Sequence, residues 1–178
     1  MIRLPLETER LVIRPFEPER DAAPLHELWG DAGAMQFIPG GARANVEETR
    51  ERLESLPDRA PDGLGFWALE ERASGRLVGG VGLFPLGWQG PELELAYHVV
   101  PSAWNRGFAS EAAAAVLAVA WEARLDHVVA VAMPGNLASQ RVMEKVGMSR
   151  EGPARYRDFE VVRYSIARPP DLDHKGTD

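Results

Sequence analysis

The feature that most constrains the fold is the segment PSAWNRGFASEAAAAVLAVAWEAR, residues 101–124, in which a glycine stands just before the most helix-prone stretch of the chain. The alanine-rich run predicts a long helix over about residues 109–123. Its first backbone N–H groups have no partner inside the helix, and Gly107 beside them has no side chain. An anion can bind at such a helix start, so the segment predicts a binding site as well as a helix.

The flanking segments have alternating strand and helix patterns, which together predict an α/β domain built on a mixed sheet. Strands are expected at about residues 9–16, 64–71, 75–84, 92–100, 126–133, 148–152 and 159–167. Three more helices are expected after capping side chains: 22–30 after Asp21, 46–56 after Asn45 and 137–146 after Asn136, the last ended by Gly147. One domain is expected over residues 6–168, followed by a flexible tail, 169–178.

Composition excludes several classes of function. The chain has no cysteine, which removes disulfides, thiolate metal sites and an acyl-cysteine intermediate, and its four histidines have no ligand-like spacing, so no metal site is predicted. A net charge of −7 disfavours nucleic-acid binding. Because the chain has neither a signal-like apolar stretch nor a membrane-spanning one, we expect a cytoplasmic protein without a membrane partner.

Three kinds of glycine pattern could indicate a phosphate site. Residues 79–82, GGVG, lie inside an apolar strand pattern and open no helix, so a dinucleotide-binding interpretation fails. No GxxxxGK[ST] motif is present. Only Arg106-Gly107-Phe108-Ala109 lies between a strand and a helix, although a tight packing turn is the commoner explanation of so short a pattern.

The order of these segments resembles the GNAT superfamily of N-acetyltransferases, and within it the RimJ/RimL-like branch. The resemblance rests on TERLVIRPFEPERDAAPLHEL, ELAYHVVPSAWNRGFASEA and NLASQRVMEKVGMSREG, and it covers residues 6–168. It departs from the superfamily pattern [QR]-x-x-G-x-[GA] at Trp104. The resemblance implies one domain with a GNAT-type mixed, mostly antiparallel central sheet flanked by about four helices. It also implies acetyl-CoA as co-substrate.

The resemblance further implies which residues bind the coenzyme. Backbone N–H groups at residues 106–111 would hold the pyrophosphate, with Arg106 adding charge. The peptide-like pantetheine arm would lie as an added strand against His98, Val99 and Val100, whose backbone also offers an N–H group to the thioester oxygen. The expected coenzyme-binding residues are His98, Val99, Val100, Arg106, Gly107, Phe108, Ala109, Ser110 and Asn136.

Glu94 and Ser139 are the expected catalytic residues. Strand alternation puts Glu94 on one sheet face with His98, where it can accept the amine proton, bind a cationic acceptor or simply be solvated. In the resembling branch the serine lies close to the sulfur, so Ser139 is expected to donate a hydrogen bond to the leaving thiolate. Asn136 and Ser139 also fit a plain helix cap.

The acceptor is expected to be a primary amine, either a protein N-terminal α-amine or a small molecule, attacking acetyl-CoA directly in a ternary complex. Phe37, Trp88, Tyr156 and Arg157, on the variable loops, are the expected acceptor-binding residues. The alternatives are a catalytically idle acyl-CoA-sensing module of the same fold and a regulator that binds ATP or NAD. A monomer or a homodimer is expected.

Overall fold

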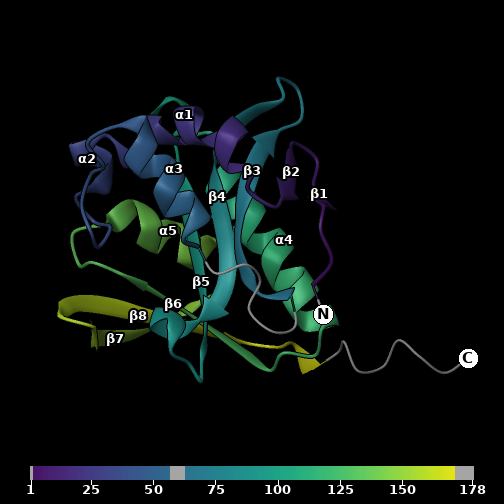
Figure 1. The fold of residues 1–178 in the computed structure, drawn as a ribbon. Helices are drawn as coiled ribbons and strands as arrows, with labels where there is room; N and C mark the ends of the chain where they lie inside the picture. Colours follow the sequence, from purple (N-terminus) through teal and green to yellow (C-terminus); the bar gives the residue numbers. More distant parts are fainter. Residues whose placement is uncertain (1, 57–62, 171–178) are drawn as a thin grey trace, which may run out of the picture.

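The computed structural model describes residues 2–56 and 63–170, which form one eight-stranded sheet with helices packed against it (Figure 1). The strands are β1 Leu6–Glu7, β2 Leu11–Arg14, β3 Gly65–Glu71, β4 Arg76–Pro85, β5 Leu93–Val99, β6 His127–Ala132, β7 Ser149–Tyr156 and β8 Phe159–Ala167. The helices are α1 Pro18–Trp29, α2 Ala32–Met35, α3 Val46–Glu54, α4 Phe108–Glu122 and α5 Leu137–Lys145. Most of the predicted tail lies outside the described residues.

The strand order is β1-β2-β3-β4-β5-β6-β8-β7, and every neighbouring pair is antiparallel except β5 and β6. This confirms the predicted mixed, mostly antiparallel sheet. The short helix α2 is one helix more than was predicted. Because β5 and β6 are parallel, a crossover must join them, and α4 supplies it.

The predicted caps at Asn45 and Asn136 are confirmed. The Asn45 side chain accepts a hydrogen bond from the Glu48 N–H at 2.9 Å, and Asn136 accepts one from the Ser139 N–H at 3.1 Å. Gly147 follows the end of α5 with a φ of +89°, the left-handed conformation that ends a helix without strain only at glycine.

The predicted cap at Asp21 is wrong. Helix α1 begins three residues earlier, at Pro18, and Asp21 is buried inside it at 1% exposure. Its carboxylate accepts two hydrogen bonds from the Arg14 guanidinium, at 2.7 and 2.8 Å, and one from the Glu17 N–H at 2.8 Å. Arg14 also donates to Glu70 on β3 at 2.9 Å. One ion cluster therefore joins β2, β3 and α1.

Gly80 of β4 creates space for aromatic rings, and Gly79 and Gly82 allow the neighbouring strand backbones to approach closely. A methyl group at Gly80 would lie 2.6 Å from the Phe66 ring, which packs against Phe16 and His98 at centroid distances of 5.9 and 5.3 Å. Within residues 2–56 and 63–170, no helix is both long and apolar enough to cross a membrane.

Arg14→Met should lower the free energy of unfolding by about 3–5 kcal/mol, because it leaves the buried Asp21 carboxylate without its bidentate partner. Urea unfolding of both proteins measures the loss. The matched control is Arg20→Met, which removes another contact to Glu70 from a side chain that is 47% exposed, and which should cost at most about 1 kcal/mol. Equal losses in the two variants would contradict this account of the cluster.

Candidate active site

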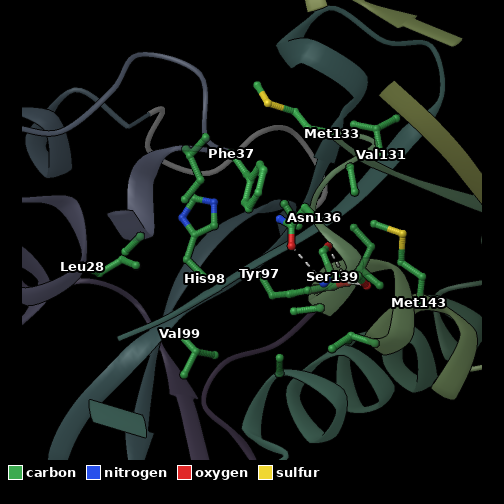
Figure 2. Close-up of a pocket in the computed structure, with 18 of the residues that line it drawn as sticks. Leu28, Phe37, Tyr97, His98, Val99, Val131, Met133, Asn136, Ser139 and Met143 are labelled. Carbon is green, nitrogen blue, oxygen red and sulfur yellow. Dashed lines mark hydrogen bonds between the residues drawn. The ribbon is translucent and has the colours of Figure 1, made fainter. Parts of the chain in front are cut away.

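A cavity of about 720 Å³ lies where β5 and β6 separate, and Figure 2 shows part of its lining. The two strands are in register at one pair only, Glu94 with Val129. Residues predicted from the sequence that line the cavity are Phe37, Trp88, Glu94, His98, Val99, Gly107, Phe108, Ala109, Ser110, Asn136, Ser139, Tyr156 and Arg157. Among the described residues, no three His, Asp or Glu side chains form a group that could hold a metal ion.

The start of α4 forms one end of this cavity. Gly107 precedes the helix with a φ of +81°, a left-handed conformation that is strained for any residue with a Cβ. A methyl group added there would approach only the Arg10 Nη2 atom, at 3.5 Å. Gly107 is therefore required by the turn, as the packing interpretation says, and it also leaves the space an anion needs.

Arg106 does not line the large cavity. Its guanidinium pairs with Glu71 and lies 4.5 Å from the centre of the Phe108 ring. Arg10 lies over the same ring at 4.9 Å and donates to the Arg106 carbonyl at 2.8 Å. Together with Lys145, these arginines line a second hollow beside Gly107. Arg10 was not predicted from the sequence, because only the folded sheet brings it to this helix.

The backbone of β5 offers fewer free groups than predicted. The Val100 N–H donates to the Val78 carbonyl at 3.0 Å, and strand alternation turns the His98 backbone towards β4 as well. The backbone groups of Tyr97 and Val99 face the gap beside β6. The Val99 carbonyl already accepts a hydrogen bond from the Trp104 indole N–H at 2.7 Å. Of the three predicted backbone partners, Val99 alone faces the gap.

Glu94 is buried, at 6% exposure, so the solvated-strand interpretation is wrong. Its carboxylate accepts a hydrogen bond from the Gly87 N–H at 3.3 Å. Burial raises the pKa of Glu94 above its ordinary value of 4.5, and the Gly87 N–H, the Tyr156 hydroxyl and the Arg157 charge oppose this rise. Burial and the neighbouring carboxylate raise the pKa of Tyr156 to about 12.

His98 lies on the same strand face as Glu94, and its ring points into the cavity near Phe37 (Figure 2). Its Nδ1 atom is buried and has no hydrogen-bond partner among the described residues. Burial, with a smaller contribution from the Arg52 charge, lowers the pKa of His98 to about 4. The imidazole is therefore uncharged at neutral pH.

Tyr97 and Ser139 bring two hydroxyl groups together on the opposite face of β5. The Tyr97 hydroxyl donates to the Ser139 carbonyl at 2.8 Å and lies 3.1 Å from the Ser139 hydroxyl (Figure 2). Burial raises the pKa of Tyr97, which keeps the phenol neutral. No role was predicted for Tyr97 from the sequence. At the start of α5, the Asn136 side-chain oxygen accepts the capping hydrogen bond. A ligand beside Asn136 would therefore contact its side-chain NH₂ group.

Comparisons with known proteins agree with this geometry. A family model described as an acetyltransferase (GNAT) domain matches residues 10–149. The uncharacterized N-acetyltransferase YnaD of Bacillus subtilis is 32% identical over 155 residues, covering 83% of this chain and 84% of that protein. The crystal structure of a GNAT-family acetyltransferase from Bacillus anthracis has a TM-score of 0.78 and 30% identity, covering 91% of this chain and 97% of that one. A putative ribosomal-protein-serine acetyltransferase from Vibrio cholerae shares the fold, with a TM-score of 0.72, 18% identity and coverage of 90% and 95%.

Glu94→Gln should raise the melting temperature at neutral pH, because burial raises the pKa of Glu94 and makes its ionised form costly in the folded protein. With a raised folded-state pKa, this cost is present above that pKa and disappears as the pH falls through it. The advantage of the variant should therefore shrink as the pH falls from neutral through the raised pKa of Glu94 towards 4.5, as followed by thermal unfolding.

Glu92→Gln, at the residue just before β5, is the matched control, and its effect on the melting temperature should have the opposite sign. A hydrogen bond from Arg163 lowers the pKa of Glu92, so its carboxylate stabilises the fold above pH 4.5 and loses that effect as the pH falls through the lowered value. This variant should be less stable than the unsubstituted protein at neutral pH, and the deficit should fade on acidification. If the melting temperatures of both variants shift in the same direction at neutral pH, the opposite pKa shifts assigned to Glu94 and Glu92 are wrong.

Proposed function

Because the chain belongs to the GNAT acetyltransferase family, we propose that this acetyltransferase moves an acetyl group from acetyl-CoA to a primary amine by direct attack in a ternary complex. The observation that carries the proposal is a single cavity that joins the Gly107 helix start, the open backbone edge of β5 and the buried carboxylate of Glu94. Membership of the RimJ/RimL-like branch is part of the proposal, supported by the shared fold of the Vibrio cholerae protein.

The coenzyme would bind in this cavity between the start of α4 and the open backbone edge of β5. The first N–H groups of α4 are suited to the pyrophosphate, because Gly107 leaves space beside them. Arg10, Arg106 and Lys145 line the hollow beside the same turn. Glu111 pairs with Arg10 and Glu71 with Arg106, so a bound pyrophosphate would compete with these carboxylates for the two arginines. The pantetheine amides would then pair with the Tyr97 and Val99 backbone, in the manner of an added strand.

Glu94 is suited to accept the proton that the attacking amine loses. A general base works best when its pKa lies near the working pH, and burial moves the pKa of Glu94 in that direction. As the C–N bond forms, the negative charge on the thioester oxygen can be stabilised by the Val99 N–H. The C–S bond then breaks, and the sulfur leaves as a thiolate.

Ser139 is suited to stabilise that thiolate. Because the Tyr97 hydroxyl hydrogen is directed at the Ser139 carbonyl, the serine hydroxyl is the donor in its 3.1 Å contact with Tyr97, and rotation of this hydroxyl would turn its hydrogen to the sulfur. The alternative of a catalytically idle acyl-CoA sensor gives no reason to keep a carboxylate buried at a cost to stability, whereas proton transfer does.

Coenzyme A should raise the melting temperature by about 5 °C or more at 100 times its Kd, and ATP or NAD should do much less. Gly107→Val should abolish this shift, because the side chain would fill the space beside the α4 N–H groups. The control is Gly75→Val, at a left-handed turn position (φ +65°) with no atom within 4 Å. Both variants should lose stability through backbone strain, but only Gly107→Val should lose the coenzyme response. Equal shifts with all three nucleotides would contradict the proposed binding site.

Glu94→Gln should lower kcat/KM by ~10²-fold near neutral pH, because it removes the proton acceptor, while the Kd for coenzyme A stays unchanged. The loss should shrink as the pH approaches the pKa of the acceptor amine, about 8 for an α-amine and about 10.4 for a lysine-type amine. Thiol release measured across this range provides the test, with Glu92→Gln as control. A pH-independent loss with a raised KM would instead make Glu94 an acceptor-binding carboxylate.

A further inference from the structure

The cavity carries a charge opposite to that of the protein. The chain has a net charge of −7, yet the charged side chains among the described lining residues are Arg52, Arg141, Arg157 and Glu94. Arg141 lies on α5 with Ser139, on the side proposed for the coenzyme. Arg52 and Arg157 remain for the acceptor, and they come from α3 and from the turn between β7 and β8.

Arg157 is connected to Glu94 through one backbone residue. Its Nη2 atom donates to the Gly87 carbonyl at 3.3 Å, and the Gly87 N–H donates to Glu94 at 3.3 Å. Arg157 also has a φ of +53°, in the left-handed region, which is unfavourable for a residue with a side chain. Arg157 is the first residue of the two-residue turn that joins β7 to β8, a turn that favours a positive φ, so the hairpin itself fixes where this arginine lies.

Arg52 extends this cluster from the opposite wall. Its guanidinium makes one hydrogen bond, to the Ser55 hydroxyl at 3.3 Å, and no carboxylate of the described residues lies within 4 Å of it. Burial, followed by the charges of Arg43 and Arg157, lowers the pKa of Arg52. The Arg43 Nε atom is buried without a hydrogen-bond partner among the described residues. Elsewhere the partly buried Arg14 and Arg163 lie against carboxylates.

We propose that the acceptor is a small amine that also carries an anionic group, and that this group lies against Arg52 and Arg157 while the amine faces Glu94. The proposal rests on the proposed function. Guanidinium groups bind the planar oxygens of carboxylates and phosphates with paired hydrogen bonds. Since Gly87 contacts both Arg157 and Glu94, the amine and the anionic group are separated by only a few bonds, as in an amino acid or an amino phosphate.

Calorimetric titration of the coenzyme A-saturated protein tests this. The probes are acetylated, so they have no amine to titrate. Each anionic probe is compared with a neutral partner. N-acetyl amino acids are compared with their primary amides, and N-acetyl-2-aminoethyl phosphate is compared with N-acetylethanolamine. In the pair that shows the largest difference, the Kd of the anionic probe should be lower than that of its neutral partner by ~10-fold or more. Comparing the carboxylate and phosphate pairs identifies which anion is preferred.

Arg52→Gln and Arg157→Gln should each remove most of this preference. The control, Arg155→Gln, changes an exposed arginine on the same hairpin outside the cavity lining and should keep it. Equal binding of acids and amides by the unsubstituted protein, or no binding of any anionic probe, would overturn the proposal without relying on a variant. Tighter binding of an N-acetylated acidic tripeptide than of every single amino acid would also overturn it.

A melting-temperature scan with coenzyme A on the same samples separates the two proposals. A retained coenzyme shift without an anion preference overturns the acceptor assignment alone. Loss of the coenzyme shift in the unsubstituted protein overturns the proposed function.

Discussion

The separation of β5 from β6 is the constraint on which the rest of the structure depends. The two strands are parallel, are in register at one residue pair, and leave the backbone groups of Tyr97 and Val99 without a neighbouring strand. Unpaired backbone groups are costly unless water, a side chain or a ligand bonds to them. The Trp104 indole covers one carbonyl, and the remaining groups line a cavity into which the starts of α4 and α5 open. The position of the site therefore follows from how the sheet is interrupted.

The two faces of β5 also carry different groups of the candidate site. Alternation directs Glu94 and His98 towards α3 and the β7–β8 turn, and directs Tyr97 towards Ser139 on α5. A buried carboxylate and a pair of hydroxyl groups are thus held on opposite sides of one extended backbone. The buried Glu94 carboxylate is unfavourable for folding, so the rest of the fold must supply more stability than this group costs.

The sequence predicted the elements well, because strand alternation, helix periodicity and the caps at Asn45 and Asn136 are local signals. Asp21 was misassigned because its partner, Arg14, is set by packing rather than by a helix start. Arg106 was assigned from its place beside Gly107, whereas its side chain pairs across to β3 at Glu71. Arg10 and Arg52 were missed, because only the meeting of distant elements gives them their positions. Phe37, Trp88, Tyr156 and Arg157 were expected because loops vary among relatives, and all four line the cavity, although Tyr156 is the last residue of β7 rather than part of a loop.

The contrast between an acidic protein and an arginine-lined cavity has a kinetic consequence. An anion approaching a surface of net charge −7 is repelled at long range and attracted only near the cavity mouth. Salt screens exposed charges separated by more than a Debye length of about 8 Å at physiological ionic strength, and screens partly buried charges much less. Moderate salt therefore reduces the long-range repulsion between an anion and the acidic protein more than it weakens the attraction of the anion to the arginines of the cavity. Anionic ligands should associate faster as ionic strength rises from very low values, the reverse of ordinary electrostatic steering.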